Sequence, residues 1–231
     1  MLDYDNYYSR ACFRQALLSL MGEKSFDIIT VKDIVYRSNH SRSTFYLHYR
    51  DKYQLLEEIE SELISGFEAQ IRRVQTCRLV VFLNNIIQGF HPDFLLYFHY
   101  IKKNAEAFIP LVKNQHHLDF SHKFITGINK YRLEHASEWF GGEINPIHMQ
   151  TFEKHFNGDF PNIFIDWVKN GLKPPEEEMA AMLSFRYKGY ILMFDDMEPN
   201  EMLERILKLI QKSWAMEKIF DVPEPTGIPG S

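Results

Sequence analysis

Three helix-start signals follow one another within residues 30–52, and they restrict this part of the chain to short helices joined by tight corners. Thr30 is followed three residues later by Asp33, a variant of the capping box that opens many helices. Ser41 and Asp51 are of the residue types preferred at helix N-caps. A helix that starts after Thr30 therefore ends before Ser41, and the next one ends before Asp51. The spacing predicts two short helices followed by a long one.

The corner between the two short helices falls in the stretch SNHS, which contains no glycine. A tight corner of this kind usually needs one residue with a positive φ, and asparagine is among the few residues that tolerate it. Asn39 is therefore the expected corner residue. Phe45 and Tyr49 lie four residues apart in the helix that follows, so we expect both to face inward.

Apolar residues recur at helical spacing along the rest of the chain, and strand signals are nearly absent. The first helix has an apolar stripe and is expected to end at Gly22. The long helix after Asp51 has a buried stripe consisting of Leu55, Leu56, Ile59, Leu63, Ile64 and Phe67. Further helices are expected at 78–88, 92–103, 104–115, 118–138, 147–170, 176–194 and 199–218, with Gly171 capping one of them and Pro174–Pro175 opening the next.

These patterns predict an all-α protein with two parts. Residues 1–57 form a three-helix head with a helix-turn-helix motif at about 30–49, and a long helix joins it to a larger helical body at 58–220. The tail at 221–231 is rich in proline and glycine and is expected to be disordered.

Composition excludes several classes of protein. The chain has 231 residues, of which 45% are hydrophobic, but no apolar run approaches the length of a membrane span and no signal peptide is evident. Its two cysteines are expected to be reduced, which favours a cytoplasmic location. The histidines at His116, His117, His122 and His155 have no metal-binding spacing, so we expect no metal, no cofactor and no catalytic residue.

The charge distribution is uneven along the chain. The net charge is −5, yet residues 1–55 contain eight Lys and Arg against six Asp and Glu. A mildly basic head on an acidic body fits a protein that contacts DNA through one end, although charge alone is equally compatible with a chance division.

The outward residues of the two short helices have the chemistry of a DNA reader. In a helix-turn-helix, the second helix presents polar side chains to the major groove while the first crosses the backbone. Arg42 reaches guanine or phosphate, and short hydroxyl side chains reach phosphates or base edges. A tight corner between two helices that bind nothing remains the alternative on periodicity alone.

The stretch TVKDIVYRSNHSRSTFYLHYRDKYQLL resembles the helix-turn-helix of the TetR family of bacterial transcription regulators. The matching positions are Thr30, Ile34, Ser41, Thr44, Phe45, Tyr46, His48, Lys52 and Leu55. Asn39 and Ser43 replace two glycines of the pattern, and His40 replaces a valine. Ser43 either binds phosphate or holds the helix further from DNA, and His40 is either a partly buried structural residue or a DNA contact.

The resemblance implies that Thr30 and Lys52 contact phosphates and that the recognition helix contacts both bases and backbone. The expected DNA-binding residues are Thr30, Lys32, Ser41, Arg42, Ser43, Thr44, Tyr46, His48 and Lys52. The implied partner is a double-stranded, palindromic operator, because two heads of a dimer meet two major grooves.

The stretch HFNGDFPNIFIDWVKNGLKPPEEEMAAML is similar to a subgroup of this family from low-GC Gram-positive bacteria. The resemblance implies a homodimer joined by a four-helix bundle, built from 147–170 with either 176–194 or 199–218. The expected interface residues are Phe156, Gly158, Phe160, Phe164 and Trp167.

Family members usually respond to a small-molecule effector held in the body. Aromatic residues that would line such a cavity are Tyr97, Tyr100, Phe108, Phe124 and Trp139, although aromatics at helical spacing are more often part of a core. The expected function is a homodimeric repressor whose affinity for its operator an effector changes. The alternative is a coactivator or corepressor that acts through a protein partner, with weak or no affinity for DNA.

Overall fold

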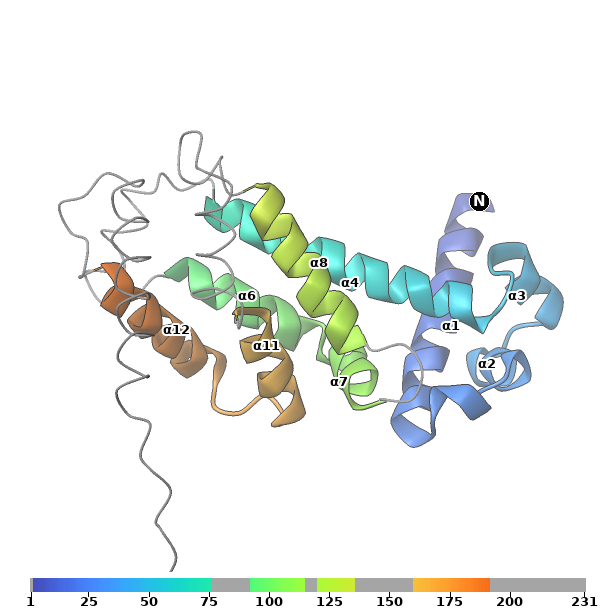
Figure 1. Ribbon diagram of the computed structural model, residues 1–231. Helices are drawn as coiled ribbons and strands as arrows, with labels where there is room; N and C mark the ends of the chain where they lie inside the picture. Colours follow the sequence, from blue (N-terminus) through green and yellow to red (C-terminus); the bar gives the residue numbers. More distant parts are fainter. Residues whose placement is uncertain (1, 76–91, 115–119, 136–159, 192–231) are drawn as a thin grey trace, which may run out of the picture.

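The computed structural model describes residues 2–75, 92–114, 120–135 and 160–191, and within these ranges the chain forms helices, turns and short connections without any strand. This confirms the all-α prediction. Figure 1 shows three N-terminal helices gathered at one end, a long helix that leads away from them, and further helices packed along the long one.

The N-terminal helices begin and end close to the predicted residues, with one exception. Their bounds are α1 Leu2–Glu23, the short 3-10 helix η1 Phe26–Ile28, α2 Val31–Ser38, α3 Arg42–His48 and α4 Lys52–Gln75. The prediction that Gly22 ends the first helix was wrong. Gly22 lies in the last turn of α1, and its backbone is outside the positive-φ region. The backbone N–H of Lys24 still donates to the carbonyl of Leu20 at 3.0 Å, so the helical pattern continues past the glycine.

The head has its own aromatic core, to which α1, α3 and the residue that caps the end of α3 contribute. Phe13 of α1 and Phe45 of α3 are both 0% exposed, and their rings meet edge to face with centroids 5.2 Å apart. Tyr49 is also buried and lies against both rings, which confirms the predicted inward positions of Phe45 and Tyr49. This core holds α3 at a defined angle to α1, which leaves the opposite side of α3 exposed.

The body consists of α6 Pro92–Lys103, α7 Ala105–Lys113, α8 Phe120–Glu134, α11 Phe160–Lys169 and α12 Glu176–Ile191. Gly171 has the predicted positive φ, at 72°, after the end of α11, and α12 starts directly after Pro175. The predicted helices at 78–88 and 199–218, the first part of 147–170 and the tail at 221–231 lie outside the described residues.

Helix α4 continues from the head into the body without interruption. The predicted division at residue 57 falls inside this helix and stays a prediction. Two ion pairs connect α1 to α4, between Arg10 and Glu58 and between Arg14 and Glu62. Further along α4, Phe67 is 0% exposed and lies at the centre of the body core. The ion pairs hold α1 against the part of α4 that leads into the body.

Candidate nucleic-acid interface

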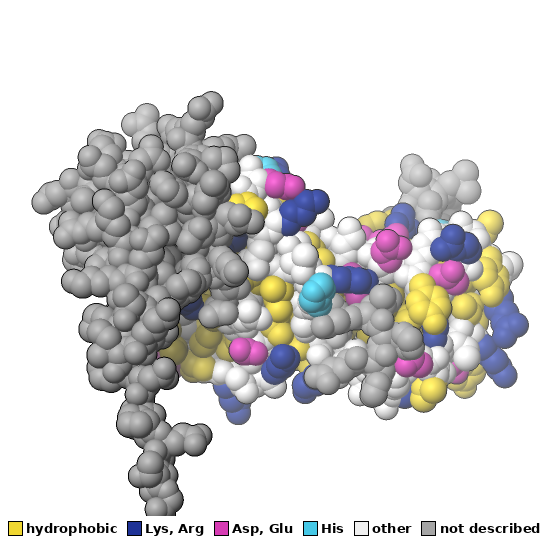
Figure 2. All heavy atoms as spheres, in the orientation of Figure 1, with side chains coloured by type: hydrophobic (Ala, Val, Ile, Leu, Met, Phe, Trp, Pro, Cys, Tyr) yellow, Lys and Arg dark blue, Asp and Glu magenta, His cyan; other side chains and the backbone are white. Residues whose placement is uncertain are grey.

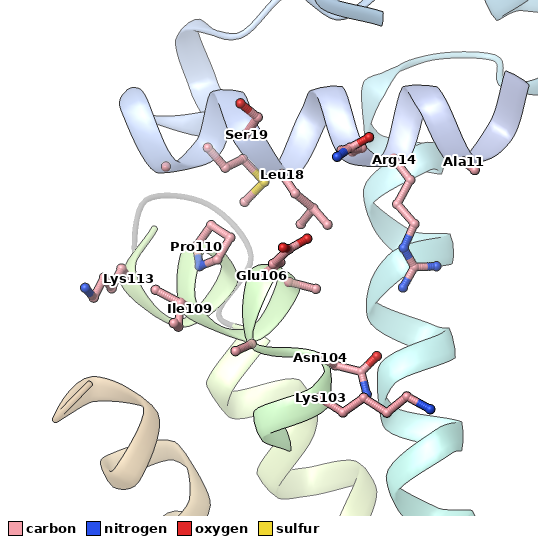
Figure 3. A pocket seen from close by; sticks show the side chains of 15 residues that line it. Ala11, Arg14, Leu18, Ser19, Lys103, Asn104, Glu106, Ile109, Pro110 and Lys113 are labelled. Atoms are coloured by element: carbon pink, nitrogen blue, oxygen red, sulfur yellow. The ribbon is translucent and has the colours of Figure 1, made fainter. Parts of the chain in front are cut away.

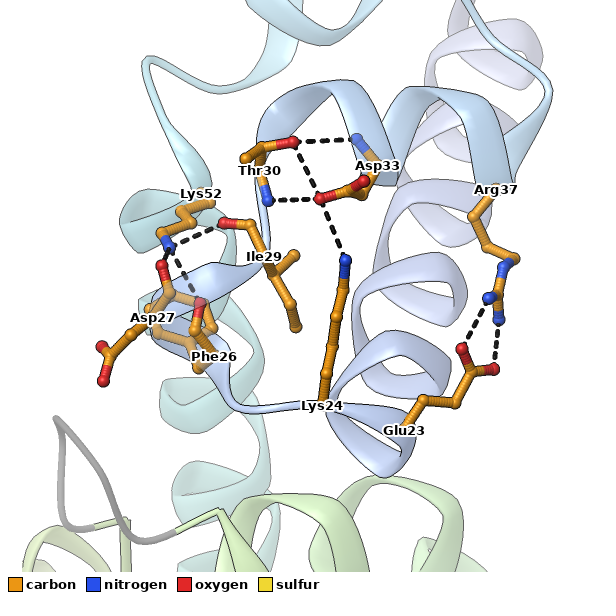
Figure 4. Close-up of polar contacts among 9 residues, drawn as sticks. All are labelled: Glu23, Lys24, Phe26, Asp27, Ile29, Thr30, Asp33, Arg37 and Lys52. Carbon is orange, nitrogen blue, oxygen red and sulfur yellow. Dashed lines mark hydrogen bonds and ion pairs between the residues drawn. The ribbon is translucent and has the colours of Figure 1, made fainter.

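The start of α2 is held by a capping box between Thr30 and Asp33. The carboxylate of Asp33 accepts from the Thr30 backbone N–H at 2.8 Å, and the Thr30 hydroxyl accepts from the Asp33 backbone N–H at 3.2 Å (Figure 4). Lys24 adds an ion pair to Asp33 at 3.2 Å. These hydrogen bonds, with the lysine, lower the pKa of Asp33 to about 2. The box fixes where α2 begins, as the sequence predicted.

The corner between α2 and α3 depends on Asn39, which has φ 56° and ψ 39° in the left-handed region. The backbone N–H of the next residue, His40, then donates to the carbonyl of Val35 at 3.0 Å, which closes the end of α2. The imidazole of His40 packs on Phe13 with centroids 5.0 Å apart, and its Nδ1 lies 2.7 Å from the carbonyl oxygen of Ser38. These contacts give His40 a structural role, one of the two alternatives.

Hydroxyl groups cluster at the start of α3. The Ser41 hydroxyl accepts from the Thr44 backbone N–H at 3.0 Å, so Ser41 is the N-cap. The same oxygen lies 2.6 Å from the Ser43 hydroxyl and 2.8 Å from the Thr44 hydroxyl. Ser43, which replaces a glycine of the family pattern, is thus exposed and bonded to its neighbours. Its hydroxyl belongs to this polar cluster.

The outward face of α3 carries Arg42, Ser43 and Tyr46, which are all exposed. Tyr46 is 57% exposed although its ring touches the edge of Phe45, which anchors the ring at one side. Lys32 is exposed on α2. In Figure 2, Lys and Arg side chains lie along the right-hand edge of the molecule, the end at which Figure 1 places α2 and α3. Exposure and charge are what a surface for a polyanion requires.

His48 has a less accessible position than the sequence indicated. It is half-buried at the end of α3, with its ring centroid 6.1 Å from that of Phe13. Burial lowers the pKa of His48, and the nearby positive charge of Arg10 lowers it further. Part of its surface therefore supports the head core.

Lys52 has a role that the sequence did not indicate. Its ammonium donates to three backbone carbonyls, those of Phe26 at 2.8 Å, Asp27 at 2.9 Å and Ile29 at 2.7 Å (Figure 4). It also lies 4.5 Å from the centre of the Phe26 ring. All three hydrogen positions of the ammonium are used inside the head, so Lys52 connects η1 to the start of α4. This geometry does not match the expected phosphate contact.

Two large exposed side chains in this region were missed by the sequence interpretation. Tyr36 on α2 is 88% exposed and Leu47 on α3 is 83% exposed. Both lie off the buried stripe of their helices, one residue after Val35 and two after Phe45, and this helical spacing is the signal that could have identified them. Arg37, by contrast, donates to both carboxylate oxygens of Glu23 at 2.7 and 2.8 Å, so its charge is used within the head.

The residues expected to line an effector cavity pack against one another. Tyr97, Phe108 and Phe124 are at most 3% exposed, and Phe67 joins Tyr97 and Phe124 at centroid distances of 5.5 and 5.0 Å. Tyr100 donates its hydroxyl to the carbonyl of Leu63 at 3.0 Å. They are core residues, which is the alternative that the sequence left open. Trp139 lies outside the described residues.

Of the residues expected at the dimer interface, three are buried within the protomer and two lie outside the described residues. Phe160, Phe164 and Trp167 are 4%, 0% and 2% exposed within the protomer, and Trp167 donates its indole N–H to the carbonyl of Pro174 at 2.8 Å. Their burial leaves almost no surface for a second subunit, which argues against that role. Phe156 and Gly158 lie outside the described residues.

Two other classes of site are absent from the part of the chain that the structure describes. No group of three or more His, Cys, Asp and Glu residues there is placed to hold a metal ion. None of the helices there combines the length and the apolar character that a membrane span requires.

Comparison with known proteins agrees with this geometry. Residues 14–59 match the family model described as bacterial regulatory proteins of the tetR family, and residues 89–185 match a model of the C-terminal region of transcriptional regulators. The chain is 25% identical over 120 residues to an uncharacterized HTH-type transcriptional regulator, YxbF, of Bacillus subtilis. That match spans 52% of this chain and 30% of the relative, so this chain covers less than a third of the relative's length. The first match contains the whole of α2, the corner and α3, and on these grounds the chain belongs to the TetR family of bacterial transcriptional regulators.

Proposed function

We propose that the protein is a homodimeric repressor that reads a palindromic operator with α3. The observation that carries the proposal is the outward face of α3, where Arg42, Ser43 and Tyr46 are exposed on a helix whose inner side is fixed by Phe45. A short helix anchored in this way presents a constant set of donors to a groove.

Specific roles follow from the chemistry of these side chains. Arg42 donates to guanine or to a phosphate, and Tyr46 and the hydroxyl cluster of Ser41, Ser43 and Thr44 bond to phosphates or base edges. Thr30 and Lys32 contact the phosphate backbone of the DNA from the start of α2. His48 contributes its exposed part, and Lys52 supports the surface from behind.

The dimer is required by the operator geometry, because two half-sites about one DNA turn apart need two heads in fixed register. The aromatic residues expected at this interface that the structure describes are buried within the protomer. We therefore assign the interface to the exposed side of α12. Met182 there is 58% exposed, and Ala181 beside it is exposed as well. Sedimentation should give twice the mass of the 27.5 kDa chain, and Met182→Glu should lower it toward the monomer.

The test of DNA reading is selection of operator fragments from genomic DNA, followed by gel shifts with variants. Arg42→Gln should weaken binding about tenfold or more, the usual effect of losing a bidentate arginine contact. Lys130→Gln is the matched control, because Lys130 is exposed on α8, far along the chain from the head. Selection of no DNA, together with retention of a stoichiometric protein partner, would instead establish the partner-dependent coregulator.

A further inference from the structure

A groove of about 720 Å³ lies between the head and the body, with α1 on one side and the α6–α7 segment on the other (Figure 3). This volume is in the range of small-molecule sites. The groove is separate from the aromatic cluster of the body core, because its lining comes from the middle and last turns of α1 and from residues 103–113. A molecule in it would touch both parts of the protein at once.

The charges along the groove favour an anion. Its lining contains Arg14, Lys103 and Lys113 but one acidic residue, Glu106. Arg14 is paired with Glu62, whereas within the described part of the chain neither Lys103 nor Lys113 has an ion-pair partner. Figure 3 shows Arg14 and Lys103 extending on the α4 side of the groove, so both cationic groups lie at that end.

Apolar side chains form much of the remaining lining, together with the polar side chains of Gln15, Ser19 and Asn104. Leu18 and Met21 come from α1, and Ile109 and Pro110 come from α7. Pro110 has no N–H, so the carbonyl of Glu106 in the preceding turn lacks its regular helix partner beside the groove. Lys113 lies at the other end of the groove from Arg14 and Lys103 (Figure 3). Apolar walls with a pair of cations at one end match a molecule that has a carboxylate head and an alkyl body.

One residue next to the groove connects the two parts of the protein. The side chain of Asn114, which directly follows Lys113, donates to the carbonyls of Met21 at 3.0 Å and Lys24 at 3.1 Å. Its oxygen accepts from the backbone N–H of Phe26 at 3.0 Å. These three hydrogen bonds hold the end of α1 and η1 against the end of α7. A change in the spacing of α1 and α7 must stretch them.

We propose that this groove binds a small alkyl carboxylate, with its head group between Arg14 and Lys103 and its alkyl chain over Leu18 and Ile109, and that Asn114 transmits occupancy to the head. The binding step is independent of the proposed DNA function, whereas the effect on operator affinity rests on it. Binding energy that differs between two spacings of α1 and α7 shifts the population of head positions. Operator and ligand then change each other's affinity by the same factor.

The binding test uses the full-length protein without DNA, with octanoate as the probe and octanol as the uncharged control. Titration calorimetry should show saturable binding of octanoate that Lys103→Gln weakens about tenfold, as expected for the loss of a charge-assisted bond. Ala11→Phe, an exposed position that lines the groove, should block binding by filling it. Lys130→Gln should leave binding unchanged, and Glu106→Gln should leave it equal or tighter.

The absence of saturable binding would overturn the proposal, as would binding that is indifferent to both Lys103→Gln and Ala11→Phe. Loss of octanoate binding in Glu106→Gln would show that the Glu106 carboxylate is required for binding and does not oppose the charge of the ligand, and it would equally overturn the proposal.

The coupling test measures operator affinity with and without octanoate. Asn114→Asp keeps the acceptor for Phe26 but loses both donors, so it should bind octanoate normally while the ligand no longer alters operator affinity. An unaltered ligand effect in this variant would refute the role of Asn114. If the wild-type protein binds octanoate but selects no DNA, the proposed function fails and the groove assignment stands.

Discussion

Replacing Lys52 with methionine separates two roles that sequence patterns cannot distinguish, a phosphate contact and an internal connector. Methionine retains most of the length of the side chain but donates no hydrogen bond. The ammonium of Lys52 holds the carbonyls of Phe26, Asp27 and Ile29, all within 2.9 Å. Hydrogen bonds to a charged group contribute about 1.5–3 kcal/mol each, and three that share one partly solvated ammonium should together contribute about 2–4 kcal/mol.

The assay combines urea unfolding with operator binding at several salt concentrations. Lys52→Met should lower the free energy of unfolding by the amount above, and its operator affinity should fall because η1, which leads into α2, is no longer held against the start of α4. The slope of log affinity against log salt should stay unchanged, since no phosphate contact is lost. Each lost phosphate contact would instead reduce the slope by about 0.9. Lys32→Met is the contrast, because Lys32 is exposed and should reduce the slope at unchanged stability.

A Lys52→Met protein with wild-type stability and a reduced salt slope would refute this assignment. It would mean that the ammonium leaves the three carbonyls when DNA binds and that the family's phosphate contact applies here after all.

Three further predictions concern packing and charge. Gly66→Ala should destabilise the protein by about 1–3 kcal/mol despite the better helix propensity of alanine, because a Cβ at position 66 would overlap the hydroxyl oxygen of Tyr100. Gly127→Ala is the control, since a Cβ there would meet a methyl group of Ile64 at 3.3 Å. Urea unfolding should show the larger loss of stability at position 66. Lys123→Met should cost about 3–5 kcal/mol at pH 8, because it leaves the buried carboxylate of Glu60 without its partner at 2.6 Å. Burial raises the pKa of Glu60, so this loss should shrink as the pH falls and the carboxylate takes up a proton, and a loss independent of pH would contradict the reasoning. Asp33→Asn should lower the melting temperature at pH 6. Because folding lowers the pKa of Asp33 to about 2, the difference in melting temperature between variant and wild type should be complete above about pH 4 and decrease below it. A difference that stays constant down to pH 3 would argue against a stabilising role of the capping carboxylate.

The sequence by itself determined the local geometry of the head. Thr30 and Asp33 bond across three residues, Ser41 bonds to Thr44, and Asn39 adopts the left-handed corner. Each of these depends on groups within one turn of chain, so neighbouring residues suffice to predict them. The exposed face of α3 followed in the same way from the spacing of its apolar residues.

The tertiary structure decided which side chains remain available for contacts outside the protomer. Lys52 reaches carbonyls 23 to 26 residues away, and Asn114 reaches α1 and η1 from 88 to 93 residues away. The aromatics expected at a cavity and at a dimer interface look identical in sequence to core residues, because helical spacing reports only that a face is apolar. Whether that face meets a ligand, a second subunit or another helix of the same chain depends on the packing of segments distant in sequence, and here the helices of the protomer itself cover it.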